Sequence, residues 1–307
     1  MVRACATSSA DEAEFVRRLR RANVLARPRF ADGRPDVVTG YSVARRPAAG
    51  ERPIWYGGGQ LGRDLALPRL RAEWPDTPQG ASTAAAEWVA ARRGRRPVSV
   101  GREASEPDAE VWQRYSQDIA QLRDQLRAVP AGDTETWARV ARETAGAFAA
   151  WSTATEAEPG PLAATSDALA RSAQTRRAPT PERGQATVVA GAAMLLMMAS
   201  RGGQGTVAQA LLLRQLANLT KALYDMHRAA GDARRAAEVA TAIRTQLVQV
   251  AERLPAAPSA PAPARGDGAA PQQAAVAVAP GSPVPARLEP HRSRQVTRPG
   301  RNPGPER

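Results

Sequence analysis

The sequence predicts a mainly α-helical protein with a small α+β module at its N-terminus, and three patterns support this fold class. Apolar residues recur at spacings of three and four through long segments in the middle of the chain, which is the period of a buried helix face. Residues 24–56 are instead rich in β-branched and aromatic residues between Gly and Asp, which is typical of short strands. Residues 255–307 hold 12 of the 26 prolines and no Phe, Trp, Tyr, Ile or Met, so we expect a disordered Pro/Ala/Arg-rich tail.

The first predicted helix begins near Ser9 and carries arginines along one side. The segment Ser9-Ala10-Asp11-Glu12 has the form of a capping box, which marks a helix N-terminus. Glu14 lies four residues before Arg18, which predicts an exposed ion pair that phosphate could readily displace. Asn23 is expected to end the helix in the left-handed conformation. The apolar face holds Phe15, Val16, Leu19 and Ala22, and the face expected to point to solvent holds Arg17, Arg18, Arg20 and Arg21.

A β-hairpin and a third strand are predicted next. Residues 24–30 and 36–44 flank the turn residues Asp32-Gly33, and residues 53–56 add a short apolar stretch. Pro28 cannot donate a backbone hydrogen bond, which places the first strand at an edge of the sheet. Together with the first helix, these strands predict a helix-plus-sheet module over residues 1–75.

Helices follow this module. Thr77-Pro78 predicts the start of a helix that ends at Gly94, and a linker follows it, so residues 76–104 are interpreted as a helix and linker. In residues 105–178, Ser105 and Asp133 are predicted N-caps of two helices. We expect these helices to form an antiparallel hairpin around residues 130–132.

The most regular apolar pattern predicts a helical bundle over residues 184–254. Two apolar stripes are separated by Gly231-Asp232 and predict long helices folded back on one another, covered by a helix over residues 186–199. The first stripe consists of Leu212, Leu216, Leu219, Leu223 and Met226, and the second consists of Val239, Ile243, Leu247, Val250 and Leu254.

The charge is strongly positive and comes almost entirely from arginine. The formal net charge is +13, and Lys221 is the only lysine. Residues 1–106 carry a net +7 and residues 256–307 a net +4. Cys5 is the single cysteine, which fits a reducing cytoplasm. The longest apolar run, residues 186–199, is shorter than the ~20 residues needed to cross a bilayer, so we expect no membrane insertion.

No motif predicts catalysis, a metal site or a cofactor. The stretch GGGQLG at residues 57–62 formally fits a dinucleotide-binding fingerprint, but no second parallel strand or βαβ unit surrounds it, so a tight glycine turn is expected. The stretch GGQGT at residues 202–206 lacks the lysine of a phosphate-binding loop and predicts an interhelical turn. His227 and His291 are the only histidines, and we interpret His227 as a partly exposed helix residue. Two histidines without a cysteine partner cannot make a zinc site.

Aromatic residues interleaved with arginines point to nucleic acid instead. Trp55 and Tyr56 lie close in sequence to several arginines, which is the mixture of rings and cations that single-stranded nucleic acid uses. The alternative for Trp55 is packing on the first helix. Arg27 and Arg29 alternate out of the first strand on one side. The candidate DNA-binding residues are Arg17, Arg18, Arg20, Arg21, Arg27, Arg29, Arg45, Arg46, Trp55, Tyr56 and Arg63, whereas core positions are predicted for Trp74, Trp88, Trp112, Trp137 and Trp151.

Several segments resemble a known family. The stretches EFVRRLRRANVLARPRF, DVVTGYSVARRP, PIWYGGGQLGRDLALPRLRAEW, ARETAGAFAAWS and GGQGTVAQALLLRQLANLTKAL resemble plasmid mobilisation relaxases of high-GC bacteria, in the portion that follows the nuclease domain. The resemblance runs from about residue 3 to residue 254. Relaxases of this kind use a catalytic tyrosine and three metal-binding histidines, which are not matched here, because no histidine set adjoins Tyr41, Tyr56, Tyr115 or Tyr224. We therefore expect no enzymatic activity, and a truncated reading frame, an accessory protein and a fragment all remain open.

Two functional hypotheses follow. The resemblance implies a DNA-associated component of plasmid or conjugative-element mobilisation, in which residues 9–74 contact the phosphate backbone, single-stranded DNA included, and the helical part docks other mobilisation or transfer proteins. The alternative is a helical protein-interaction scaffold with no DNA contact, whose arginines only solvate the surface. An enzyme with an unrecognised site is the third class.

Overall fold

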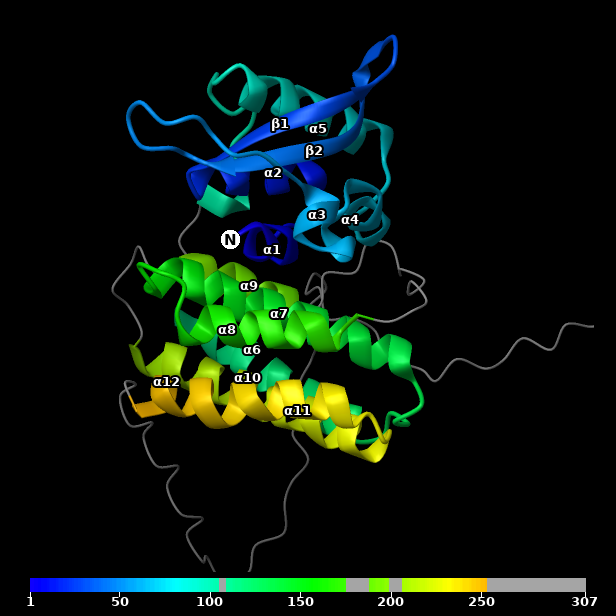
Figure 1. Cartoon of the computed structure of the whole chain (residues 1–307), viewed down its shortest axis with the longest axis vertical. Helices are drawn as coiled ribbons and strands as arrows, with labels where there is room; N and C mark the ends of the chain where they lie inside the picture. Colours follow the sequence, from blue (N-terminus) through cyan, green and yellow to red (C-terminus); the bar gives the residue numbers. More distant parts are fainter. Residues whose placement is uncertain (105–108, 175–187, 199–205, 253–307) are drawn as a thin grey trace, which may run out of the picture. The chain divides into compact units, whose positions relative to one another are not determined.

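The computed structural model describes residues 1–104, 109–174, 188–198 and 206–252, which belong to one unit of the chain, Met1–Gly266 (Figure 1). Within them the predicted fold class is confirmed, because a three-stranded antiparallel sheet near the N-terminus is followed by helices. The predicted tail 255–307, the cap at Ser105, Leu254 and most of the GGQGT turn lie outside the described residues.

The predicted hairpin is confirmed. Strands β1 (Val24–Ala31) and β2 (Arg34–Arg45) pair in antiparallel fashion, and the short β3 (Tyr56–Gly57) pairs with β2. Gly33 in the turn has a φ of 69°, which suits glycine. The sheet order is β1-β2-β3, so the Pro28 strand is indeed an edge strand.

Helix α2 (Glu12–Arg21) has Asp11 as its N-cap, two residues later than the predicted N-cap Ser9. Asp11 caps it by accepting the Glu14 amide at 2.7 Å, and the Glu14 carboxylate accepts the Ala10 amide at 2.9 Å. Ser9 is not the cap because its hydroxyl donates to the Cys5 carbonyl at the end of a short helix that was not predicted, α1 (Val2–Thr7). Asn23 has a φ of 58°, as expected for the residue that ends α2.

Four aromatic rings form the centre of the module core. The Phe15 ring on α2 lies 5.4 Å from Tyr41, 5.6 Å from Trp74 and 6.3 Å from Trp88, measured between centroids. Trp88 comes from α5 (Pro78–Arg92), whose cap at Thr77 is confirmed by a 3.1 Å bond from the Gly80 amide. Since Tyr41 belongs to β2, helices α2 and α5 cover the same face of the sheet.

The glycine stretch 57–62 forms a single helical turn, α3 (Gly58–Leu61), followed by a 3₁₀ turn at Arg63–Leu65 and by α4 (Leu67–Glu73). A Cβ at Gly58 would lie 2.5 Å from the Tyr41 ring and 2.6 Å from the Leu65 carbonyl, so the close approach here requires glycine. Because β3 is antiparallel to β2, this turn does not form a dinucleotide-binding βαβ unit.

The remaining helices share one hydrophobic core, to which the two predicted helical regions both contribute. They are α6 (Ala109–Leu126), α7 (Thr134–Thr155), α8 (Pro161–Ser172), α9 (Val188–Met198), α10 (Thr206–Ala229), α11 (Ala233–Thr241), a π-helical segment (Ala242–Leu247) and α12 (Val248–Glu252).

The predicted helix cap and the predicted buried stripe are confirmed, whereas the predicted packing of one pair of helices is wrong. The predicted cap Asp133 begins α7, and every residue of the stripe on α10 is buried. Asp232, predicted only to separate the two stripes, also caps α11. The antiparallel pair of α6 and α7 is wrong, because α6 packs on α9 and α10 while α7 packs on α8 and α9. His227 is also not partly exposed, since only 5% of it is accessible. The five tryptophans predicted to be in the core are all buried.

Candidate nucleic-acid interface

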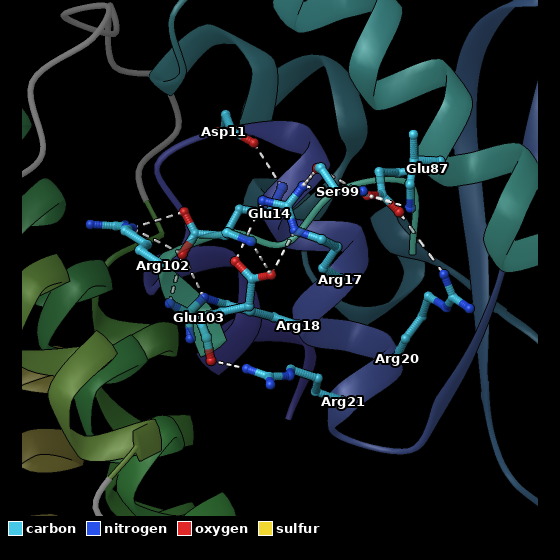
Figure 2. Close-up of polar contacts among 12 residues, drawn as sticks. Asp11, Glu14, Arg17, Arg18, Arg20, Arg21, Glu87, Ser99, Arg102 and Glu103 are labelled. Atoms are coloured by element: carbon cyan, nitrogen blue, oxygen red, sulfur yellow. Dashed lines mark hydrogen bonds and ion pairs between the residues drawn. The ribbon is translucent and has the colours of Figure 1, made fainter. Parts of the chain in front are cut away.

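The arginine face of α2 is covered by acidic groups of the same chain (Figure 2). Arg17 is 7% exposed; its Nε donates to Glu103 Oε1 at 2.7 Å and its Nη1 lies 3.5 Å from Glu87 Oε1. Arg18 pairs with Glu14 at 2.6 Å as predicted, but both side chains are buried rather than exposed. The predicted solvent-facing role is therefore wrong for Arg17 and Arg18.

The other two arginines of α2 lie nearer the surface and are also engaged. Arg20 donates to the backbone carbonyl of Arg95 and lies 3.9 Å from Glu87 Oε2. Arg21 is exposed and donates to the backbone carbonyl of Glu103. We call the set Glu14, Arg17, Arg18, Arg20, Glu87, Arg102 and Glu103 the α2 ion-pair cluster.

The segment that follows α5 closes this cluster. Residues 98–103 run back across α2, where Ser99 accepts from Arg17 at 3.1 Å and Arg102 pairs with Glu14 at 3.0 Å (Figure 2). Residues 94–104 were predicted to be a linker, so the role of this segment in closing the cluster was not predicted. The available signal was Glu87, a carboxylate beside Trp88 on a helix face that is otherwise apolar.

The pairing of Arg17 with Glu103 favours the charged form of each. Burial by itself raises the pKa of Glu103, but the hydrogen bond and positive charge of Arg17 outweigh burial, so the pKa of Glu103 is lowered overall. The Glu103 carboxylate correspondingly raises the pKa of Arg17 against the opposing effect of burial. This salt-bridged network joins α2, α5 and the 98–103 segment, and its arginines are committed to internal partners.

Three of the predicted residues lie together on the face of the sheet that α2 and α5 do not cover. Arg27 and Arg29 are exposed on the side of β1 away from the buried Val24 and Ala26. The Arg27 guanidinium carbon lies 4.1 Å from the centroid of the Trp55 ring, a cation–π contact. Trp55 therefore packs on Arg27 rather than on α2.

Small residues of β2 leave this face open. Arg27 is paired with Ser42 and Arg29 with Gly40, and a Cβ at Gly40 would lie 3.1 Å from the Arg29 guanidinium. We call Arg27, Arg29, Gly40, Ser42 and Trp55 the sheet-face patch. It presents two cations and one indole ring on a rigid antiparallel scaffold.

The remaining candidate residues do not all join this patch. Tyr56 is 48% exposed, but it pairs with Val43 and so lies on the other face of the sheet from Trp55. Arg45 and Arg46 are exposed at the end of β2, where Arg46 donates to the Asn23 side chain at 2.9 Å. Arg63 is exposed in the 3₁₀ turn after α3.

The described part of the chain holds no group of three or more His, Cys, Asp or Glu side chains placed to hold a metal ion. Among the described helices, none combines the length and the apolar character that crossing a membrane requires.

Comparison with known proteins adds no family assignment: no protein-family model, no curated protein and no solved structure matches this chain.

Proposed function

We propose that the chain is a non-catalytic, cytoplasmic, DNA-associated component of plasmid or conjugative-element mobilisation, and that its sheet-face patch contacts the phosphate backbone. The contact of Arg27 with Trp55 carries the proposal. An exposed guanidinium held on one face of an indole ring offers hydrogen-bond donors to phosphate, and the other face of the ring offers a stacking surface to an unpaired base. The setting in DNA mobilisation rests on the resemblance of the segments quoted above to relaxases.

The internal pairing of the α2 arginines narrows the proposed surface. A phosphate competing for Arg17 or Arg18 would have to replace buried carboxylates at 2.7 Å and 2.6 Å. Such a replacement would leave carboxylates without cations in a buried site, which costs several kcal/mol. The exposed Arg27 and Arg29 carry no such penalty, so we assign backbone contact to them.

The alternative function is a protein-interaction scaffold without DNA contact. It is favoured by the α2 ion-pair cluster, because that cluster removes arginines from the charge available to a polyanion. The two functions differ in one measurable property, since backbone contacts release counterions and make affinity fall steeply with salt.

The double variant Arg27→Glu, Arg29→Glu is expected to weaken binding of a fluorescein-labelled single-stranded oligonucleotide by at least about tenfold, because two phosphate contacts become repulsions. Fluorescence anisotropy at about 0.1 M salt measures the affinity. Trp55→Ala should reduce the binding free energy for the single strand by about 1–3 kcal/mol. The reduction should be smaller for a duplex, because its bases are already stacked on one another.

The matched control is Arg214→Glu, Arg244→Glu, which changes the net charge equally at two exposed positions of the helical part. Equal losses in the two double variants would mean that bulk charge alone attracts the oligonucleotide, and the sheet-face assignment would fail. Circular dichroism checks whether each variant keeps its helical signal.

A further inference from the structure

A second surface lies between α5 and the segment that follows it. There an open hollow of about 360 Å³ is lined by Ala85, Ala86, Val89, Ala90, Arg95, Arg96 and Val98. Its floor consists of small apolar side chains of α5. Val98 at its wall is 57% exposed, and Val100 just beyond is 87% exposed. Exposed valines grouped beside an apolar hollow are typical of an interaction site.

Backbone hydrogen bonds hold the wall of the hollow in place. Gly94, with a φ of 62°, ends α5 in a Schellman turn, in which the Arg95 amide donates to the Ala90 carbonyl at 3.0 Å. The fully buried Glu87 carboxylate then accepts the amides of Val98 and Ser99 at 3.1 Å and 3.0 Å. Residues 95–99 therefore run along α5 as a fixed wall, so the hollow is preformed.

The rim of the hollow is positively charged. Arg95 and Arg96 line the hollow, and both are exposed. The only carboxylates in residues 78–104 are Glu87 and Glu103, and both are buried against Arg17. No acidic side chain of this stretch thus offsets the arginines at its surface.

We propose that this hollow docks an acidic, amphipathic helix from a partner protein. The small side chains of α5 let a second helix approach closely, an apolar residue of that helix fills the hollow, and its flanking carboxylates meet the rim arginines. The chain's own residues 256–307 carry a net +4 and do not complement this rim. Nucleic acid fits less well, because the lining has no aromatic ring for a base to stack on. This surface is independent of the sheet-face patch.

Two designed peptides of about 18 residues test the proposal with the full chain. The first carries Leu at positions i, i+3, i+4 and i+7 with Glu on both flanks, and the second replaces each Glu by Lys. We expect the acidic peptide to bind and the basic peptide to fail in fluorescence anisotropy. Ala85→Gln, which fills the hollow without adding charge, and Arg95→Glu, Arg96→Glu, which reverses the charge of the rim, should each weaken acidic-peptide binding by about tenfold or more.

Val98→Ser gives an independent variant that keeps the amide held by Glu87 and removes only the apolar wall. It should weaken peptide binding and leave oligonucleotide affinity unchanged, which separates this site from the proposed DNA site. Equal binding of both peptides, or acidic-peptide binding that survives Ala85→Gln and Val98→Ser, would overturn the proposal. A loss of oligonucleotide affinity in Arg95→Glu, Arg96→Glu as large as that in Arg27→Glu, Arg29→Glu would assign the rim to nucleic acid instead.

Discussion

Replacement of Arg17 by methionine is expected to destabilise the folded chain by about 3–5 kcal/mol, because it leaves buried carboxylates without their cation. Glu103 loses a partner at 2.7 Å and Glu87 loses one at 3.5 Å. Urea denaturation followed by far-UV circular dichroism measures the free energy of unfolding. Arg21→Met is the matched control, since Arg21 is exposed and donates to a backbone carbonyl, and it should cost less than about 1 kcal/mol.

The pH dependence of the same variant distinguishes ion pairing from simple packing. The pKa of Glu103 is lowered in the folded chain, so its contribution is fully present above the unfolded pKa of about 4.3 and is lost as the pH falls through the folded pKa. The stability gap between the parent and Arg17→Met should therefore narrow on acidification below about pH 4. A gap near zero at neutral pH, or one that stays constant down to low pH, would contradict the role assigned to the cluster.

Trp88→Ala is expected to lower the free energy of unfolding, measured by urea denaturation, by about 3–5 kcal/mol, because it creates a cavity at the centre of the module. The Trp88 ring is fully buried, lies 5.6 Å from the Tyr41 ring, and donates its indole N–H to Glu12 at 2.7 Å. Trp88→Phe keeps an aromatic ring and removes the N–H donor, so it should cost clearly less than the alanine variant. Equal losses would show that the hydrogen bond to Glu12, and not ring packing, dominates at this position.

Local signals in the sequence were enough for most elements of the fold. Thr77 and Asp133 were predictable caps because a cap is formed by a side chain and an amide three residues away. The hairpin was also predictable from nearby residues, because its strands are marked by β-branched and aromatic residues and its turn by Asp32-Gly33. The pairing of α6 with α9 and α10 was not predictable, since apolar stripes identify a buried face and do not specify which helix covers it.

The candidate site was only partly predictable. Alternation along β1 placed Arg27 and Arg29 on one face, and the β2–β3 register then decides that Trp55 joins them while Tyr56 does not. The interpretation of the α2 arginines failed because the partner of Arg17 is Glu103, 86 residues away in sequence. A helical wheel shows that a face is polar, and it cannot show that another segment of the chain supplies the opposite charges.

The salt dependence of oligonucleotide binding tests the sheet-face assignment most directly. Each phosphate neutralised on a single strand contributes about 0.7 to the slope of log affinity against log salt. The parent should show a steep slope, and Arg27→Ala, Arg29→Ala should reduce its magnitude by about 1.4, because two backbone contacts are lost. An unchanged slope in the double variant would place phosphate contact elsewhere on the chain, and a parent that shows no salt-sensitive binding would support the scaffold function instead.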